Sequence, residues 1–470
     1  MKPYVVYNIR GNNVKIYNSL TRQKEVFVPL EAGKVKIYVC GPTVYDYAHI
    51  GNARTYAAFD VMVRYFKWQG YQVTYVRNIT DIDDKIIKRA NENQEAFTAV
   101  VERFTHAIHD DFAALGLLKP DDEPRATAYI PQIVNMISAL IAKEVAYVAS
   151  NGDVYYQVRR FETYGQLSHR NIDQLESGAR IEINDVKRDP LDFVLWKLAK
   201  PNEPSWSSPW GEGRPGWHIE CSAMSTTILS SHFDIHGGGK DLIFPHHENE
   251  IAQSEAACGQ KFVNYWMHAG YLQIDKEKMS KSLGNFFTIR DVLKTYSPEI
   301  LRFFLINGHY RSPVQYSANV LRQAASALER LYTALRSLPA ADPLKETVFE
   351  QQFIAAMDDD FNTPLAFSVL FELAHEIQRE RLVDLQKAAQ LGALLKLLGG
   401  VLGILQSDPD AFLKGENLGI SSDEIEQLIQ ARNTARAEKN WTEADRIRKT
   451  LSDLSIILED GPTGTTWKKS

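Results

Sequence analysis

Two cysteines, a histidine and a glutamate carry the clearest metal-binding chemistry in this sequence. Cys40 ends an apolar run that begins at Val35 and is predicted to be a strand, and doubly wound folds bind ligands at the carboxyl ends of such strands. Cys221 follows much later, while His246 and Glu250 are spaced at i and i+4 and share one face of a predicted helix. Two thiolates, an imidazole and a carboxylate suit zinc. The spacing alone leaves an alternative open, in which the thiols are simply buried and the His/Glu pair only satisfies charge.

The segment after Cys40 joins the strand to a helix that begins near His49. Backbone N–H groups at a helix N-terminus favour a phosphate group. His49 and Asn52 lie three residues apart on one helix face and can both point towards that anion. Gly51 between them lets a ligand approach the backbone. Taken alone, the pattern also fits a capped helix with a surface histidine.

A further segment, Lys278 to Ser282, places two lysines around small hydroxyl side chains on a predicted loop. Such a loop can close over a triphosphate, where Lys278 and Lys281 would neutralise the charge that builds up as pyrophosphate leaves. Short Lys/Ser loops are usually solvated surface, so this spacing alone does not decide between the two interpretations.

The elements that must position these residues alternate in type. The predicted strands 35–40 and 73–76 are each followed by a loop and a helical pattern, which favours a doubly wound parallel sheet. The alternating strand and helix pattern is lost between Thr127 and Ser225, where a stretch rich in Pro, Trp, Ser and Gly indicates an insertion with long loops. Helical patterns dominate after Arg290.

The bulk composition limits the class of protein. A chain of 470 residues predicts several domains, because single cores stop growing near about 250–300 residues. The net charge of −6 requires that any RNA surface be a local basic patch. Only three cysteines are present, which argues against a disulfide framework. No apolar run approaches the roughly 20 residues that cross a bilayer, and Met1–Leu20 lacks a secretory or transit pattern, so we expect a cytoplasmic protein.

Taken together, the His49 and Lys278 segments resemble the two signatures of class I aminoacyl-tRNA synthetases, H-I-G-H and K-M-S-K-S. The second signature is present letter for letter, whereas Asn52 replaces the final histidine of the first. Asparagine can donate a hydrogen bond but cannot become cationic. The resemblance implies that His49, Asn52, Lys278 and Lys281 stabilise charge on the reacting ATP, with Gly51 and Lys281 at the nucleotide.

Longer blocks make the resemblance more specific and run from about Val14 to Lys469. In order, they are similar to the cysteinyl-tRNA synthetase family at Y-V-C-G-P-T-V-Y-D, N-I-T-D-I-D-D-K-I, P-G-W-H-I-E-C-S-A-M, H-G-G-G-x-D-L-x-F-P-H-H-E-N-E and D-D-D-F-N-T-P. This likeness implies one zinc per chain, which would select cysteine because a coordinating thiol is deprotonated and a serine hydroxyl cannot match it. The implied site residues are the zinc ligands Cys40, Cys221, His246 and Glu250, the cysteine contacts Thr80 and Trp217, and the ATP contacts Gly238 and Asp241.

The resemblance also implies a fold, partners and a reaction. We expect a split Rossmann-type catalytic domain with a connective insertion, followed by a mainly helical tRNA-binding region and a small C-terminal domain. The enzyme would use ATP with Mg²⁺ to form cysteinyl-adenylate and pass cysteine to its tRNA, as a monomer without a membrane partner. The predicted domains are two Rossmann halves at 14–129 and 226–295, the insertion at 130–225, a linker and stem-contact region at 296–345, a helical anticodon-binding bundle at 346–415 and a C-terminal anticodon-recognition domain at 416–470.

The C-terminal domain carries predicted tRNA contacts at Arg436, Trp441, Asp445 and Asp460. An aromatic among polar residues could stack on an unpaired base, although Trp441 could instead pack against Trp467 above a solvated charged face. Two rival functions remain: the related ligase that joins cysteine to an amino sugar, and a synthetase-like RNA-binding protein without catalysis. The C-terminal helices argue against the first, and the intact signatures argue against the second.

Overall fold

The computed structural model describes residues 13–171, 186–274, 277–278, 286–414, 422–454, 456–461 and 464–469. The chain divides into two compact units. The first consists of Met1–Ala324, Gln351–Ser368 and Val401–Gly403, and the second of Ala325–Glu350, Val369–Gly400 and Ile404–Ser470. A short piece from late in the chain therefore belongs with the first unit.

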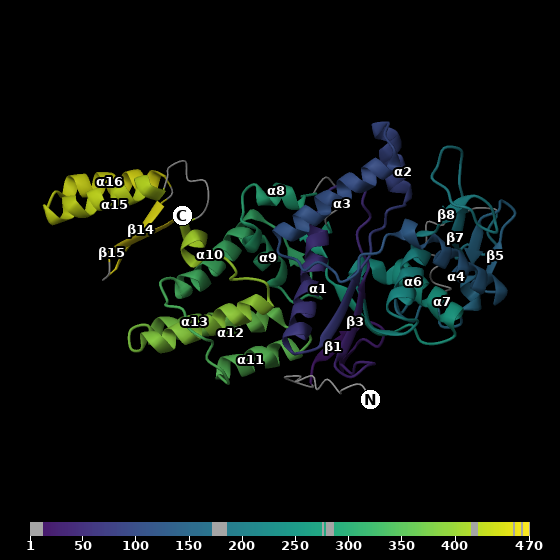
Figure 1. The fold of residues 1–470 in the computed structure, drawn as a ribbon, viewed down its shortest axis with the longest axis horizontal. Helices are drawn as coiled ribbons and strands as arrows, with labels where there is room; N and C mark the ends of the chain where they lie inside the picture. Colours follow the sequence, from purple (N-terminus) through teal and green to yellow (C-terminus); the bar gives the residue numbers. More distant parts are fainter. Residues whose placement is uncertain are drawn as a thin grey trace, which may run out of the picture. The chain divides into compact units, whose positions relative to one another are not determined.

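The first unit is built on a parallel sheet with the strand order β10-β9-β3-β4. Its strands are β3 (Lys34–Val39), β4 (Gln72–Arg77), β9 (Phe233–Gly239) and β10 (Val263–Ala269). Buried apolar residues fill these strands, as expected for a sheet covered on both faces. The two predicted strands are confirmed as β3 and β4. The sheet joins two segments separated by an insertion, which confirms the split Rossmann-type prediction (Figure 1).

Helices and small sheets surround this parallel sheet. Helix α1 (Ile50–Trp68) connects β3 to β4 and is buried along most of its length. The other helices are α2 (Asp84–Asn93), α3 (Phe97–Ala114), α6 (Trp217–Ile228), α7 (Glu248–Cys258), α8 (Ile289–Leu293) and α9 (Pro298–Ile306). The hairpin β1 (Lys15–Asn18) and β2 (Gln23–Val26) precedes the sheet, and β11 (Leu272–Ile274), β12 (Glu277–Lys278) and β13 (Val314–Gln315) form a further small sheet.

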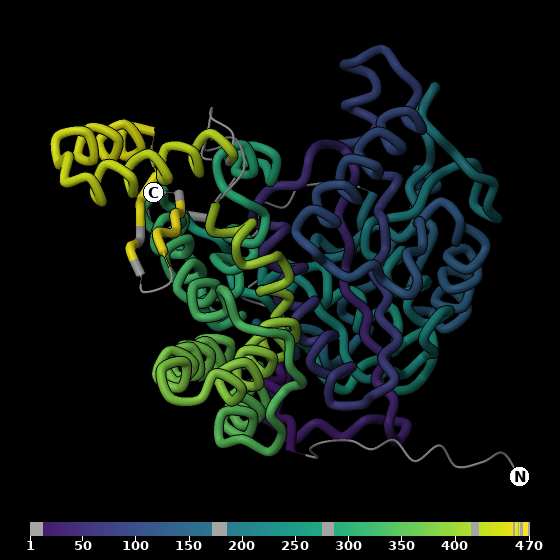
Figure 2. Tube along the Cα trace, turned by 60° about the vertical axis from the view of Figure 1, so that its left-hand side comes forward, coloured from purple at the N-terminus to yellow at the C-terminus, as the bar shows by residue number. Residues whose placement is uncertain are grey.

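The insertion forms its own core. Helix α4 (Ile130–Ala142) covers an antiparallel sheet of β5 (Ala146–Val148), β6 (Val154–Tyr156), β7 (Phe193–Leu198) and β8 (Gly213–Pro215). Ile133, Ile137 and Leu140 of the helix share a buried cluster with Leu195 and Trp196 of β7. After this excursion the chain returns to the parallel sheet at β9, as the teal trace in Figure 2 shows.

The second unit is mainly helical and contains most of the C-terminal part of the chain, although most of α11 and the first turns of α10 and α12 belong to the first unit. The helices after α9 are α10 (Ala318–Leu335), α11 (Val348–Asp358), α12 (Thr363–Glu380), α13 (Leu385–Val401), α14 (Pro409–Lys414), α15 (Ser422–Ala437) and α16 (Trp441–Asp453), and the strands β14 (Ile456–Gly461) and β15 (Gly464–Lys469) pair as a hairpin. Ile425, Ile429, Ile447, Leu451 and Trp467 form a separate small core. Among the described helices, none is both long and apolar enough to span a membrane.

Candidate functional site

Four side chains that are far apart in the sequence converge at the carboxyl end of β3. Their potential donor atoms, two sulfurs, one imidazole nitrogen and one carboxylate oxygen, all lie within 4.8 Å of one another. Cys40 directly follows β3, Cys221 lies in the second turn of α6, and His246 and Glu250 come from the start of α7 and the turn before it. All four side chains are buried. The predicted helix begins at Glu248 rather than at His246, which lies in the turn before it, but the side chains of His246 and Glu250 still meet, and the two distant cysteines join them.

The separations between these atoms match the size of a zinc site. Zn–S bonds near 2.3 Å and Zn–N or Zn–O bonds near 2.0–2.2 Å place tetrahedral ligands roughly 3.3–3.8 Å apart. Cys40 Sγ lies 3.7 Å from Cys221 Sγ and 3.4 Å from both His246 Nε2 and Glu250 Oε1. His246 Nε2 and Glu250 Oε1 are closer, at 3.0 Å. The donor set and its spacing fit one zinc ion.

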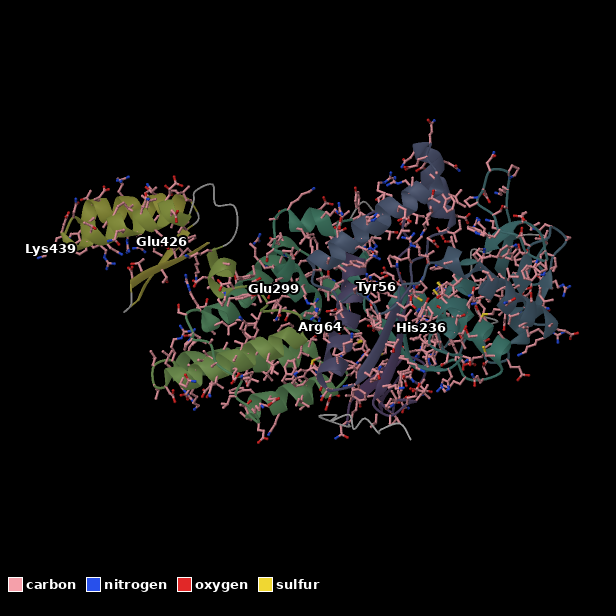
Figure 3. All side chains as sticks on the ribbon, viewed as in Figure 1. Tyr56, Arg64, His236, Glu299, Glu426 and Lys439 are labelled. Carbon is pink, nitrogen blue, oxygen red and sulfur yellow. The ribbon has the colours of Figure 1, made fainter. Side chains whose placement is uncertain are left out.

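Two further histidines hold the candidate ligands in place. His218 Nδ1 lies 2.9 Å from His246 Nδ1, so it engages the ring nitrogen that faces away from the cluster. His236 Nε2 lies 2.8 Å from Glu250 Oε2, which leaves Oε1 directed at the cluster. Figure 3 labels His236, which reaches the site from β9. Partners of this kind fix ring and carboxylate orientation at metal sites.

The electrostatics of the cluster also favour a cation. Burial raises the pKa of the Cys40 thiol, whereas a hydrogen bond from Cys40 lowers the pKa of Cys221 to about 6. Burial opposes charge on His246 and Glu250, but their mutual attraction overcomes it: the pKa of His246 rises to about 10, and His236 and His246 lower that of Glu250 to about 2. A metal bound at these residues would displace a proton from the imidazole, so its affinity would increase with pH.

A cleft of about 510 Å³ opens beside the cluster. It is lined by Cys40 and Trp217 and by His49, Gly51 and Asn52 around the start of α1. Further lining comes from Gly239, Asp241 and the segment Ala269–Leu272. The cleft therefore joins the cysteines, the helix N-terminus and the ends of β9 and β10 in one space large enough for a small-molecule ligand.

His49 and Asn52 form a capping box at the start of α1. The backbone N–H of Asn52 donates to His49 Nδ1 (3.1 Å), and the backbone N–H of His49 donates to Asn52 Oδ1 (3.2 Å). The asparagine oxygen is thus turned towards the backbone, while its amide nitrogen remains a donor. The sequence predicted a helix start here, and the reciprocal cap explains why asparagine suits this position.

The residues that follow the second signature, from Phe286 on, lie next to the first signature along the backbone. Ile50 N–H donates to Phe287 O (3.1 Å), and Ile289 N–H donates to Ala48 O (3.0 Å). The ring of Phe286 lies 5.2 Å from that of His49. Lys278 is placed by its backbone in β12, whereas Lys281 falls outside the described residues.

Of the remaining predicted contacts, Trp217 and Asp241 line this cleft, whereas Thr80 and Gly238 are not among its lining residues. The Trp217 ring lies 4.3 Å from that of His246 and is 39% exposed, so one part of the indole remains available to a ligand. Thr80 is buried and its backbone pairs with Thr43, a cleft residue, while its hydroxyl accepts from Asn78 Nδ2 at 3.3 Å. Gly238 lies on β9 with Leu242 and His247 in the space where a side chain would be.

The predicted tRNA contacts lie together in the second unit. Trp441 begins α16 and is 60% exposed, which disagrees with packing against the buried Trp467. Asp460 receives a bidentate pair from Arg432 at 3.0 and 2.9 Å and a further contact from Arg436 at 2.9 Å. Asp445 is exposed on the same helix as Trp441.

Sequence reasoning did not assign roles to His218, His236 or Asn78. Asn78 accepts a hydrogen bond from Gly41 N–H at 2.7 Å and thereby holds the residue after Cys40. All three residues lie inside the sequence blocks that resemble the cysteinyl-tRNA synthetase family, so the resemblance could have drawn attention to them. Their roles depend on tertiary hydrogen bonds that spacing does not reveal.

Known proteins share this arrangement of domains. Residues 26–326 match the family described as tRNA synthetases class I (C) catalytic domain, residues 352–406 match the DALR domain, and residues 421–467 match the cysteinyl-tRNA ligase anticodon binding domain. Methionyl-tRNA synthetase from Mycobacterium tuberculosis has a similar structure, with a TM-score of 0.56, 13% identity and coverage of 78% of this chain and 89% of that one. At that identity the likeness supports the fold alone.

The parallel sheet, the paired signatures and the catalytic-domain match define a class I aminoacyl-tRNA synthetase. Cysteine–tRNA ligase from Ectopseudomonas mendocina is 59% identical over 97% of this chain and 99% of its own length, and that from Coxiella burnetii is 58% identical over 97% and 100%. This chain belongs to the cysteine–tRNA ligase family and is an aminoacyl-tRNA ligase. The match to an anticodon binding domain disfavours the amino-sugar ligase.

Proposed function

We propose that this chain joins cysteine to its tRNA in two steps and selects cysteine through a bound zinc ion. The carboxylate of cysteine attacks the α-phosphorus of ATP, giving cysteinyl-adenylate and pyrophosphate. A hydroxyl of the 3′-terminal ribose then takes the acyl group and releases AMP. The observation that carries this proposal is the convergence of two thiols, an imidazole and a carboxylate at the wall of the ligand cleft.

The proposed zinc ligands are Cys40, Cys221, His246 and Glu250, with one ion per chain. When bound, zinc supplies a thiolate-preferring ligand position, which separates cysteine from serine where pocket shape alone would give about 1–3 kcal/mol. Four protein ligands normally close a zinc site, so we propose that Glu250 is the weakest of them. His236 holds Oε2, and Glu250 therefore stays in place whether or not Oε1 is a ligand.

The other site residues bind and orient the substrates. We assign Trp217 to one face of the bound cysteine, because its ring packs against that of His246, and Thr80 to its amino group, because its backbone pairs with Thr43 of the cleft lining. Gly238 and Asp241, at the end of β9, serve the adenosine side of the cleft. A carboxylate such as Asp241 can accept hydrogen bonds from ribose hydroxyls.

The residues of the two signatures stabilise the negative charge that develops on the phosphates. His49, Gly51 and Asn52 present donors at the N-terminus of α1, where the helix dipole favours an anion. Lys278 and Lys281, with Mg²⁺ carried by ATP, add positive charge as pyrophosphate leaves. These interactions strengthen in the transition state, so they should affect the activation rate more than cysteine binding.

We further propose that the C-terminal residues Arg436, Trp441, Asp445 and Asp460 contact the anticodon. The exposed indole of Trp441 offers a stacking surface for an unpaired base. The predicted domain boundaries go with this proposal, with catalysis in 14–129 and 226–295 and tRNA recognition after residue 296.

ATP–pyrophosphate exchange tests the proposal directly. We expect exchange with cysteine and a rate with serine that is lower by several orders of magnitude, because a hydroxyl is a poor zinc ligand. Serine exchange within about 10-fold of cysteine would instead indicate a pocket that recognises shape alone. An absence of exchange with cysteine in zinc-loaded protein would contradict the proposed function itself.

A further inference from the structure

The D-D-D-F-N-T-P block, residues 358–364, belongs to the first compact unit although it lies late in the sequence. Asp360 and Phe361 both have positive φ values, 64° and 52°, in the left-handed region that side-chain-bearing residues rarely adopt. Two consecutive residues of this kind persist only where surrounding contacts determine the backbone. The contacts of Asp360 show what this conformation achieves.

The Asp360 carboxylate is fully buried and receives three hydrogen bonds. The backbone N–H of Tyr17 and the hydroxyl of Tyr310 both donate to Oδ1, at 2.8 and 2.7 Å. Arg311 Nε donates to Oδ2 at 2.7 Å, and its guanidinium lies 4.3 Å from the centre of the Tyr17 ring. Asp360 therefore fixes two neighbouring residues of the segment that follows α9, Asn307–Ser312.

That segment supports one wall of the ligand cleft. The backbone N–H of Gly270 donates to Tyr310 O at 2.7 Å, and that of Val314 donates to Tyr271 O at 2.9 Å. A side chain on Gly270 would come within 2.4 Å of Ser312 O, so the two backbones are in close contact. Gly270 and Tyr271 line the cleft beside Asp241.

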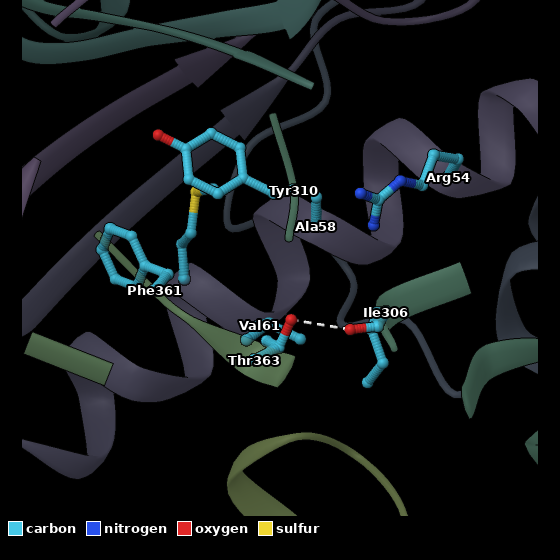
Figure 4. Close-up of a pocket in the computed structure, with 8 residues that line it drawn as sticks. Arg54, Ala58, Val61, Ile306, Tyr310, Phe361 and Thr363 are labelled. Atoms are coloured by element: carbon cyan, nitrogen blue, oxygen red, sulfur yellow. Dashed lines mark hydrogen bonds between the residues drawn. The ribbon is translucent and has the colours of Figure 1, made fainter. Parts of the chain in front are cut away.

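Helix α1 holds the same segment from the other side. Arg54, one turn after the capping box, donates to His309 O at 2.7 Å and to Gly308 O at 3.2 Å. Figure 4 shows Arg54, Tyr310, Phe361 and Thr363 around a small cavity between these elements, with Thr363 donating to Ile306 O at 2.7 Å. The block, the segment after α9, the cleft wall and α1 therefore form one continuous hydrogen-bonded and packed assembly.

We infer that Asp360 is a positioning residue for the nucleotide side of the cleft. It orders Tyr310 and Arg311, and through the Tyr310–Gly270 hydrogen bond it sets the backbone against which ATP binds. This inference rests on the proposed function, since it assigns ATP to the wall formed by Ala269–Leu272. Cysteine is assigned to Cys40 and Trp217, which are not part of this wall, so its binding should not depend on Asp360.

Asp360→Asn tests the inference, with Asp359→Asn as the matched control. The substitution Asp360→Asn replaces one of the two carboxylate oxygens with an amide donor, so the side chain can no longer accept from both Tyr310 at Oδ1 and Arg311 at Oδ2. The neighbouring Asp359 is half exposed and its carboxylate pairs with Lys24. We expect kcat/KM for ATP in pyrophosphate exchange to fall about 10- to 100-fold in Asp360→Asn, since small misplacements near a reacting group have effects of this size. The KM for cysteine should stay within about twofold, and Asp359→Asn should match the wild type.

Rates are expressed per active site, from the burst of adenylate formation. A purely structural role would lower the number of active sites and leave the KM for ATP unchanged, which would overturn the inference. Equal losses in Asp359→Asn would also overturn it. If Asp360→Asn does not fold, Tyr310→Phe decides the question: it removes only the hydroxyl, and we expect a smaller rise in the KM for ATP with the KM for cysteine unchanged. Exchange by the wild type and by Asp359→Asn shows separately whether the proposed function holds.

Discussion

His218 and His236 determine which atoms of their neighbours are left for a metal. Each occupies the far side of a candidate ligand, His218 at His246 Nδ1 and His236 at Glu250 Oε2. Burial lowers the pKa of His218 well below its ordinary value, so this ring stays neutral near His246. A neutral partner can orient the ligand ring without repelling a cation, which is the chemistry required next to a metal.

The three cysteines make a controlled test of the metal site. Purified protein should contain one zinc per chain, and Cys221→Ala should lose most of it because a thiolate ligand is removed. Cys258→Ala is the matched control, since Cys258 is exposed and lies outside the cluster. Metal content by mass spectrometry, after dialysis against a chelator, measures the difference. Full zinc retention in both Cys40→Ala and Cys221→Ala would contradict the ligand assignment.

At the scale of elements, the cap of α1 connects helix stability to catalysis. Asn52 Oδ1 accepts from His49 N–H, and His49 Nδ1 accepts from Asn52 N–H. Each side chain therefore forms a hydrogen bond with the backbone of the other residue across the first turn of the helix. Loss of such a cap typically costs about 0.5–2 kcal/mol. The same two side chains face the cleft. A substitution here should therefore affect both stability and rate.

We expect Asn52→Ala to lower the melting temperature slightly and to reduce kcat for ATP–pyrophosphate exchange. Ser297→Ala is the control, because Ser297 caps α9 through Ile300 N–H and does not line the cleft. The two variants should lose similar stability, measured by thermal unfolding, while only Asn52→Ala should lose exchange rate. If both retain the wild-type kcat, the side chain of Asn52 serves only the helix.

The sequence predicted those elements whose signals are local. Apolar runs located β3 and β4, and the i, i+4 spacing predicted that the side chains of His246 and Glu250 meet. Spacing could not decide whether Cys40 and Cys221 meet, because their distance depends on the pairing of β3 with β9. The role of Asp360 could not be predicted from the sequence either, because its hydrogen-bond partners, residues 17 and 310–311, are far from it along the chain.

At the scale of the whole molecule, the C-terminal residues have a core separate from the catalytic sheet. Ile425, Ile429, Ile447 and Leu451 cluster around Trp467, and Arg336 within the second unit donates to Trp467 O at 3.1 Å. Within the part of the chain that the structure describes, none of the cleft-lining or candidate metal-ligating residues belongs to this core. Removal of this region should therefore leave the catalytic unit folded.

A chain ending at Lys414 should activate cysteine at close to the wild-type rate but charge tRNA poorly. The reason is that basic side chains such as Arg436 and the exposed Trp441 are lost, and with them phosphate and base contacts. Both half-reactions are measured on the truncated protein, and full-length Trp441→Ala serves as the milder comparison. Unchanged tRNA affinity would contradict the proposal that this region binds the anticodon. Loss of cysteine activation would indicate that the removed region stabilises the catalytic unit.

The strand order β10-β9-β3-β4 also has a consequence for synthesis on the ribosome. Strand β3 ends at Val39, but β9, which pairs with its second edge, begins only at Phe233. At translation rates of about 5–20 residues per second, the nascent chain carries an unpaired apolar edge for roughly 10–40 s. Exposed edges of this kind recruit other strands. The antiparallel sheet β5-β6-β7-β8 is completed by Pro215, before β9 emerges, so it can fold first and bring the two halves of the parallel sheet together.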